Sequence, residues 1–332
     1  MALLELKNLK TFFTTKRGIV KAVNDVSYSV DPGKTLGVVG ESGSGKSVSA
    51  MSILQLLDGN GYIDSGSIQF DGKDLSKLSR NEMYKIRGND ISVIFQEPMT
   101  SLNPVFTVEK QVAEPFIIHQ GMTKEQARVK VIEMLKDVKI PNPEVVAKQY
   151  PHQLSGGMRQ RVMIAMALAC QPKLLIADEP TTALDVTIQA QILKLMNELK
   201  REHGTAILFI THDLGVIAQM ADDVAVMYCG QVVEKAPART IFGKAEFSHP
   251  YTEGLMVSIP RLDTPANVRL DAIPGAVPHP LDLPKGCKFA PRCKYCTQKC
   301  LDEEPALVEV APNQQVRCFY ARKEERYANL SK

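Results

Sequence analysis

A glycine-rich segment that ends in a lysine and a serine is the first place where this chain could do chemistry. Residues Gly40–Ser47 read G-E-S-G-S-G-K-S and follow the apolar run Thr35–Val39, which predicts a buried strand, a loop and then a helix. In such a loop backbone N–H groups turn toward phosphate oxygens, the lysine adds positive charge, and the serine hydroxyl suits Mg²⁺. We therefore expect a nucleoside triphosphate here. Its expected ligands are Gly40, Ser42, Gly43, Ser44, Gly45, Lys46, Ser47 and the residue at position 48.

Acidic and imidazole side chains follow two other apolar runs. Leu174–Ala177 is followed by Asp178 and Glu179, and Ala206–Ile210 is followed closely by His212. Asp178 is expected in the Mg²⁺ shell, and Glu179 is expected to orient or deprotonate the attacking water. Together with the phosphate-binding loop, these residues predict nucleotide hydrolysis.

A second glycine-led segment, Leu154–Gln160, contains Ser155, Gly156 and Gly157. The serine is a good N-cap, and the glycines leave backbone amides uncovered at the start of a predicted helix. The helix dipole adds partial positive charge there, so the segment suits another anion. One segment of each kind in a single chain indicates that a second subunit completes each site.

Apolar periodicity predicts an α/β fold with a parallel sheet. Alternating residues near Leu4–Leu6 and Val26–Val30 suggest the strands of an antiparallel layer. Continuous apolar runs suggest further buried parallel strands, at 91–95, 174–177, 206–210 and 224–228. Ile188, Ile192, Leu195, Met196 and Leu199 share one face of a helix that His203 and Gly204 end.

Two regions depart from this alternation. Residues from about 103 to 169 are helical in pattern, with a capping box at Thr123–Gln126, and predict a helical subdomain inserted into the sheet core. Seven prolines between Pro260 and Pro291 predict an extended segment, and a cysteine cluster follows it. We expect one domain over residues 1–240 and a second region over 241–332.

Composition excludes several classes of protein. The net charge of +3 without a long basic run gives nucleic-acid binding no support. No apolar run approaches the ~18 residues that span a bilayer, and the N-terminus lacks a signal-peptide pattern. A cytosolic protein is expected, with any membrane role acting through a partner.

The segment Ser155–Gln160 resembles the signature sequence of ABC-type ATPases, and the other elements of that family follow in the family order over residues 3–235. The resemblance implies a P-loop NTPase fold with a RecA-like parallel core, an antiparallel β layer and an inserted helical subdomain. It implies ATP sandwiched between two subunits, with Ser155 and its glycines facing the partner's γ-phosphate. The implied roles are adenine stacking for Phe13, the Q-loop for Gln96, the D-loop for Thr182–Asp185, the switch for His212, and catalysis by Glu179, His212, Gln96 and Lys46.

Three later segments resemble the oligopeptide/dipeptide importers within that family: Gln96–Pro104, Phe247–Thr252 and Gly286–Cys293. This likeness implies a second ATPase subunit (a paralogue or a second copy), two permease subunits that dock near 96–103, and an external solute-binding protein. It places the chain on the cytoplasmic face of the membrane. Related importers carry nickel or glutathione, and a soluble ABC ATPase that acts on DNA or ribosomes is the alternative class. A nucleotide sensor without hydrolysis conflicts with Glu179 and His212.

Five of the seven cysteines lie between Cys287 and Cys318. Cys287, Cys293, Cys300 and Cys318 fit the four-cysteine pattern of the importer extension, for which the resemblance implies a [4Fe-4S] cluster. Four thiolates also suit tetrahedral zinc, and the spacing leaves a cluster, zinc and a site without metal all open. Disulfide bonds are the least favoured alternative, because the cysteine count is odd and there is no export signal. Cys296 departs from the pattern as a bystander or a substitute ligand. The two remaining cysteines, Cys170 and Cys229, are expected to be packing residues.

Overall fold

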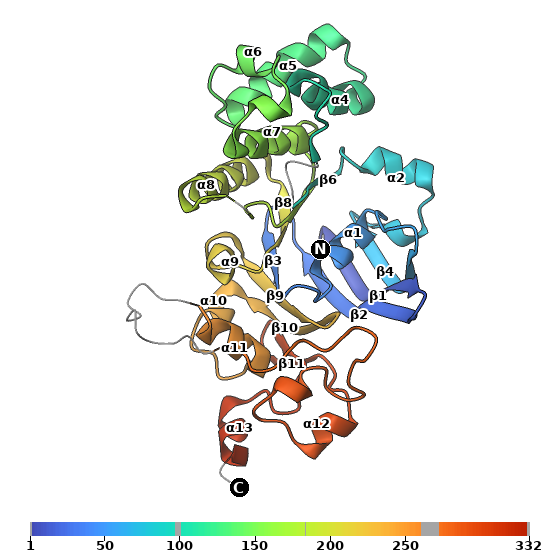
Figure 1. The fold of residues 1–332 in the computed structure, drawn as a ribbon, viewed down its shortest axis with the longest axis vertical. Helices are drawn as coiled ribbons and strands as arrows, with labels where there is room; N and C mark the ends of the chain where they lie inside the picture. The colour runs from blue at the N-terminus through green and yellow to red at the C-terminus, as the bar shows by residue number, and fades with distance from the viewer. Residues whose placement is uncertain (1, 97–100, 183, 260–271, 331–332) are drawn as a thin grey trace. The chain divides into compact units, whose positions relative to one another are not determined.

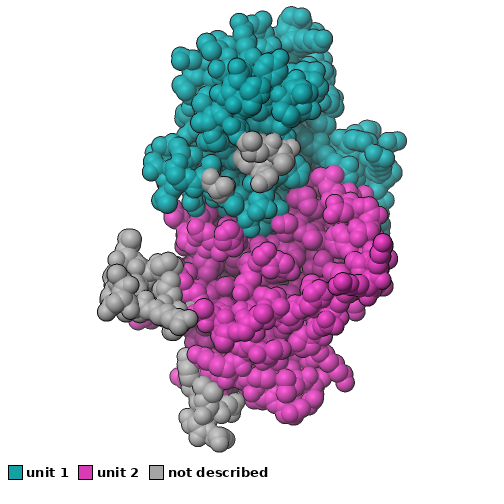
Figure 2. Space-filling view, in the orientation of Figure 1, with its two compact units in different colours: residues 1, 30–34, 77–210 teal, residues 2–29, 35–76, 211–332 magenta. Residues whose placement is uncertain are grey.

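The computed structural model describes residues 2–96, 101–182, 184–259 and 272–330. The chain forms two compact units that are interleaved in sequence (Figure 2). Unit 1 contains residues 30–34 and 77–210, and unit 2 contains residues 2–29, 35–76 and 211–332. Residues 97–100 of the predicted permease-docking segment, Ala183 of the predicted D-loop and residues 260–271 of the proline-rich segment lie outside the described residues.

Unit 2 contains the predicted antiparallel layer. Its sheet has the order β2 (Gly18–Val30), β1 (Leu4–Thr15), β4 (Gly61–Phe70) and β5 (Lys73–Asp74). The pairs β1–β4 and β4–β5 are antiparallel. The alternating residues Leu4, Leu6, Val26, Tyr28 and Val30 are all buried, so the prediction from their period of two is confirmed.

A second, mixed sheet of unit 2 leads into the phosphate-binding segment. Its strands run in the order β11 (Val308–Ala311), β12 (Gln314–Val316), β10 (Gln231–Pro237), β9 (Asp223–Tyr228) and β3 (Thr35–Val39). β3 pairs parallel with β9, and the other neighbours pair antiparallel. Every residue of β3 is buried, as a continuous apolar run predicts.

Three helices of unit 2 pack against these sheets: α1 contacts β1, α9 contacts β3, and α10 contacts β9 and β10 (Figure 1). α9 lies so close to β3 that a Cβ on Gly37 would come within 2.8 Å of the Ile217 side chain. The helices of this unit are α1 (Lys46–Ile53), α9 (Leu214–Met220), α10 (Ala238–Ile241), α11 (Pro250–Val257), α12 (Gln298–Asp302) and α13 (Lys323–Leu330), with 3₁₀ turns η1 (Leu75–Lys77) and η3 (Ala290–Arg292).

Unit 1 contains three parallel strands in the order β8, β7, β6. They are β6 (Ile91–Ile94), β7 (Leu174–Asp178) and β8 (Ala206–Ile210). The residues of β7 and β8 are buried throughout. The parallel strands predicted from continuous apolar runs are therefore present in both units.

Unit 1 also contains a helical cluster, in which α4, α5, α6 and α7 pack together (Figure 1). Thr123 and Gln126 form the expected capping box at the start of α5, with N···O distances of 2.9 and 3.3 Å. The helices of this unit are α2 (Arg80–Ile86), α4 (Val108–Gln120), α5 (Lys124–Asp137), α6 (Pro143–Val146), α7 (Gly156–Leu168) and α8 (Val186–His203), with the 3₁₀ turn η2 (Pro151–Gln153). In the described ranges, no helix has both the length and the hydropathy to cross a bilayer.

Candidate nucleotide-binding and hydrolysis site

The phosphate loop, Gly40–Ser47, connects β3 to α1 in unit 2. Gly40 and Gly45 have φ angles of 151° and 94°, values at which any residue with a side chain has a strained backbone. A Cβ on Gly40 would overlap the Met227 carbonyl oxygen, and one on Gly45 would overlap the Ala22 carbonyl oxygen. The loop conformation therefore requires glycine at both positions.

Polar groups of this loop converge on its interior. The Lys46 side chain is buried, and its Nζ donates to the carbonyl oxygens of Gly40 (2.8 Å) and Glu41 (3.0 Å). Ser44 Oγ is buried with no hydrogen-bond partner among the described residues. These are the groups that a bound phosphate can engage. Position 48 is Val48, whose side chain has no polar group, so only its backbone could serve as the ligand expected there.

Phe13 lies on β1 and is half-buried, whereas its neighbour Phe12 is only 8% exposed. Phe12 packs edge-on against Tyr62, with ring centroids 6.3 Å apart. Phe13 faces Gly61, where a Cβ would come within 2.6 Å of its ring. The structure therefore leaves the Phe13 ring accessible and uses the Phe12 ring in packing.

The predicted carboxylates lie in unit 1, at the end of β7. Asp178 is the last residue of the strand and is 7% exposed. Glu179 follows it with a φ of 47°, a conformation that non-glycine residues adopt rarely and often at functional sites. Its Oε2 accepts hydrogen bonds from Gln96 Nε2 and Thr182 Oγ1, both at 3.0 Å. Two residues predicted to be catalytic, Gln96 and Glu179, are thus in direct contact.

His212 lies in unit 2 and is exposed. The preceding residue, Thr211, donates its N–H to the carbonyl of Val38 on β3 (3.2 Å), so the histidine comes one residue after a backbone contact with the strand that leads into the phosphate loop. Asp213 caps α9 by accepting from the N–H groups of Gly215 and Val216.

The signature segment, Ser155–Gln160, begins α7 in unit 1. Ser155 is the N-cap, as expected, and its Oγ accepts from Met158 N at 3.3 Å. Ser155 and Gly156 are exposed. Arg159 Nε anchors the helix start by donating to the Pro151 carbonyl (2.9 Å). The exposed helix start supplies N–H groups and partial positive charge that suit an anion.

Sequence reasoning missed three residues that contact this machinery. Thr182 was seen only as part of a loop, yet it holds Glu179. Tyr251 and Arg292 contact Glu41 of the phosphate loop from 210 and 251 residues away. The one signal that could have found them is their position in the Phe247–Thr252 and Gly286–Cys293 segments, for which the sequence suggested no chemistry.

The four cysteines of the expected cluster, Cys287, Cys293, Cys300 and Cys318, line one cavity of about 20 Å³ in unit 2, and Cys296 does not line it. Burial raises the pKa of Cys293 to about 12 and that of Cys318 to about 11, so these thiols are neutral at pH 7. Among the described residues, no group of three or more His, Cys, Asp or Glu side chains is arranged to hold a metal ion. The structure therefore does not support the [4Fe-4S] prediction as a formed metal site.

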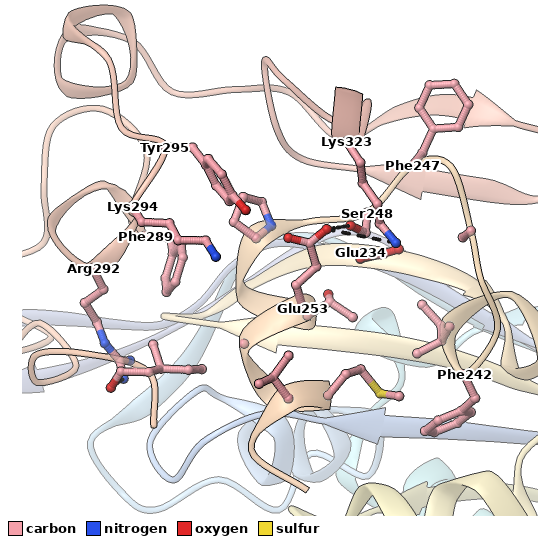
Figure 3. Close-up of a pocket in the computed structure, with 18 of the residues that line it drawn as sticks. Glu234, Phe242, Phe247, Ser248, Glu253, Phe289, Arg292, Lys294, Tyr295 and Lys323 are labelled. Atoms are coloured by element: carbon pink, nitrogen blue, oxygen red, sulfur yellow. Dashed lines mark hydrogen bonds and ion pairs between the residues drawn. The ribbon is translucent and has the colours of Figure 1, made fainter. Parts of the chain in front are cut away.

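A larger cavity, of about 720 Å³, lies elsewhere in unit 2 (Figure 3). Arg292 and Phe289 lie on one side of it, and Phe242 and Phe247 lie on the other. The residues described as its lining include none of those predicted to bind nucleotide. Size alone therefore does not identify the nucleotide site.

Comparison with known proteins agrees with this site. The ABC transporter family model matches residues 23–182, and the model of the oligopeptide/dipeptide transporter C-terminal region matches residues 233–300. The solved dimer of the ATP-binding cassette MJ0796, in a post-hydrolysis state bound to ADP and Pi, is 31% identical. It superposes with a TM-score of 0.64 over 71% of this chain and 99% of that one. Fold and site together define an ABC-type ATPase.

Relatives that match over almost their whole length show which kind of ABC ATPase the chain resembles. Over 323 residues, 97% of this chain and 98% of the relative, the chain is 53% identical to the oligopeptide transport ATP-binding protein AppD of Bacillus subtilis (strain 168). It is 51% identical over 318 residues to the oligopeptide transport ATP-binding protein OppD of Escherichia coli (strain K12), covering 96% of this chain and 93% of OppD. The chain belongs to the oligopeptide/dipeptide transporter family of ABC ATP-binding proteins.

Proposed function

We propose that this chain hydrolyses ATP to drive the uptake of oligopeptides or dipeptides through a partner permease. The observation that carries the proposal is the similarity over 97% of the chain to an oligopeptide transport protein. It includes the C-terminal region specific to that family. In this proposal residues 1–240 form the ATPase domain, with the helical subdomain at about 103–169, and residues 241–332 form the extension.

The proposed reaction is in-line attack of water on the γ-phosphorus of ATP. Glu179 takes the proton of that water, and its carboxylate is oriented for this by Gln96 and Thr182, which both donate to Oε2. Lys46 neutralises charge on the transferring phosphoryl group, and His212 senses that group. The Ser47 hydroxyl, the Gln96 amide and the Asp178 carboxylate are oxygen donors of the kind that Mg²⁺ prefers, and the bound ion neutralises phosphate charge.

Replacement of the base tests this chemistry. Glu179→Gln keeps an oxygen that can accept from Gln96 and Thr182 but removes the proton acceptor, so turnover should fall by about 10²–10⁴-fold while ATP binding is retained. Glu202→Gln, on the exposed end of α8, is the matched control and should hydrolyse ATP normally. A Glu179→Gln protein with wild-type phosphate release would remove this residue from the role.

The transported solute is tested separately. A strain that lacks this chain should lose uptake of labelled peptides and regain it when the chain is restored. Restored uptake of nickel or glutathione, with peptide uptake unaffected throughout, would assign the chain to another solute of the same importer class.

Two copies of the ATPase, or this chain and a paralogue, complete each other's sites in this proposal. The exposed start of α7 at Ser155 binds the γ-phosphate on the partner's phosphate loop, and the dimeric MJ0796 cassette supports such pairing. Two permease subunits at the cytoplasmic face and an external solute-binding protein complete the assembly. The Glu179→Gln chain should dimerise on adding ATP, alone or with its paralogue, as measured by light scattering. A persistent monomer with both present contradicts the pairing.

We also propose that the four-cysteine cavity holds a [4Fe-4S] cluster. What supports this proposal is the donor set: four cysteine sulfurs are the usual ligands of such a cluster, all four line one cavity, and their thiols would lose their protons on binding it. A buried cation supports it too: Arg326 is 1% exposed, lines the same cavity, and leaves its Nε and Nη1 without partners among the described groups. A single zinc ion is less well matched. Its four ligands must lie about 2.3 Å from one point, and the described cysteines are not gathered in that way.

Metal analysis separates the alternatives. Anaerobically purified chain should contain about four iron and four sulfide per molecule and absorb visible light. Cys293→Ser should lose both, whereas Cys296→Ser, outside the cavity lining, should keep them. Stoichiometric zinc without iron would replace the cluster with a zinc site, and a colourless, metal-free protein would end the proposal.

A further inference from the structure

Glu41, the second residue of the phosphate loop, carries a negative charge in a loop proposed to hold a highly charged anion. A carboxylate there opposes triphosphate binding unless it is compensated. The compensating charge comes from Arg292, in the extension. Its Nη1 donates to Glu41 Oε2 at 2.6 Å and its Nη2 donates to Oε1 at 3.1 Å, which is a two-point ion pair.

Arg292 is itself fixed on its other side. Only 4% of its side chain is exposed. Its Nε donates to the Pro274 carbonyl (3.0 Å), and Nη2 also reaches the Ile273 carbonyl (3.4 Å). Nη1 also donates to Tyr228 Oη (3.5 Å). Because these other contacts hold the guanidinium, it has a set position before it meets Glu41.

A second contact from the extension holds the backbone of the same residue. The Glu41 N–H donates to Tyr251 Oη at 2.8 Å, and the Tyr251 side chain is completely buried. Its ring packs against Tyr228 at the end of β9 and against Phe289, with centroids 4.7 and 5.5 Å apart. The Glu41 carbonyl in turn accepts from Lys46 Nζ. One residue thus links the extension to the lysine of the phosphate loop.

We propose that Arg292 and Tyr251 are positioning residues through which the extension sets the conformation and charge of the phosphate loop, and with them the affinity for ATP. The inference rests on the proposed binding of ATP at Gly40–Ser47. All the groups involved belong to unit 2. The two contacts give a role to the Phe247–Thr252 and Gly286–Cys293 segments that is separate from the cysteine cavity.

Equilibrium binding of MgATP to the full chain, together with the KM and kcat of its ATPase activity, tests the proposal. Arg292→Gln should raise the Kd and KM for ATP by about tenfold, the usual scale of coupling between sites, with kcat at saturating ATP little changed. Tyr251→Phe removes one hydroxyl and keeps the packing, so it should shift Kd in the same direction by a smaller factor.

The charge argument predicts a specific rescue. In the double variant Glu41→Gln/Arg292→Gln no carboxylate remains to repel the phosphates, so Kd should return most of the way to the wild-type value. Added salt should also reduce the defect of Arg292→Gln, because it screens the exposed carboxylate. A merely structural role for Arg292 would give a double variant at least as weak as the single one.

Arg317→Gln is the matched control. Arg317 is another buried arginine of the extension, but it pairs with Asp25 (3.0 Å) and the Val232 carbonyl (3.0 Å) instead of the phosphate loop. Its loss should lower the melting temperature without changing the Kd for ATP.

Two outcomes would overturn the inference. The first is a folded Arg292→Gln chain with wild-type Kd together with an unaffected Tyr251→Phe chain. The second is an equal loss of ATP binding in Arg317→Gln. Lys46→Ala separates this failure from failure of the proposed nucleotide site: if Lys46→Ala also binds ATP normally, the site itself is wrong.

Discussion

The phosphate loop and the signature segment are both glycine-led starts of helices, yet they are built in opposite ways. The phosphate loop has a buried lysine, two glycines that admit no side chain, and support from the extension at Glu41. The start of α7 is capped by its own Ser155 and is exposed. The first is fixed by contacts inside the chain. The second is held by its own cap and by Arg159, which donates to the Pro151 carbonyl, and it keeps an open face, as suits a surface completed by another subunit.

Substituting one glycine in each segment should give the largest contrast. Gly45→Ala places a side chain at a φ of 94° and against the Ala22 carbonyl. It should weaken MgATP binding about tenfold or more, since such strain costs about 1–3 kcal/mol. Among the described residues, the added Cβ of Gly156→Ala would meet only Leu184, at 4.0 Å, so ATP binding by the single chain should be unchanged. The measurement is titration with a fluorescent ATP analogue. Equal effects at the two glycines would contradict the contrast.

Removing the N-cap of α7 should give a smaller effect that appears only in the assembly. Ser155→Ala should cost about 1 kcal/mol of stability and lower the ATPase rate of the assembled transporter, while ATP binding by the isolated chain is retained. Thr123→Ala removes the corresponding cap of α5 and is the control. It should cost similar stability but leave ATPase activity intact. If both variants lose activity equally, helix stability alone explains the result.

The smallest expected effect concerns the support beneath the phosphate loop. His249 caps α11, the helix that carries Tyr251, and burial lowers the pKa of His249 to about 3. The unfolded chain therefore takes up a proton near pH 6.5 that the folded chain does not. The contribution of His249 to the free energy of unfolding is fully present above about pH 6.5. It decreases as the pH falls below that value, by about 2 kcal/mol at pH 5.

His249→Asn keeps a capping acceptor and removes the titration. Urea denaturation of both chains between pH 7.5 and pH 5 isolates the histidine as the difference between the two stability curves. Parallel curves would show that His249 is not the group that titrates. The start of α7 has no such buried histidine among its described contacts, so Ser155→Ala should not alter this pH dependence.

Local patterns were enough to predict much of this molecule. The burial of Leu4 and Leu6 follows from a period of two, and the helix Val186–His203 ends at Gly204 with a φ of 67°, as its sequence indicated. The cap at Ser155 is also a local property. These features depend on residues within a few positions of one another, which is the range over which periodicity and capping carry information.

Contacts between distant residues could not be predicted in this way. The pairing of Glu41 with Arg292 joins residues 251 positions apart, and nothing in the spacing of either segment indicates it. The interleaving of the two units also depends on contacts between distant residues, because the chain leaves each unit and returns to it later in the sequence. The cysteine pattern identified four residues that share a cavity. The arrangement of their thiols, which in the described residues do not converge on a single ion position, could not be predicted from the sequence.

The pairing of β12 with β10 means that the extension is not an appendage that can be trimmed away. Glu234 on β10 lies opposite Val316 on β12, Gln314 donates to the buried Glu234 carboxylate at 3.0 Å, and Arg317 donates to the Val232 carbonyl. A chain shortened at residue 240 would turn β10 into an edge strand with a row of unpaired backbone groups, a known route to aggregation. Residues beyond 240 therefore complete the sheet that leads into the phosphate loop.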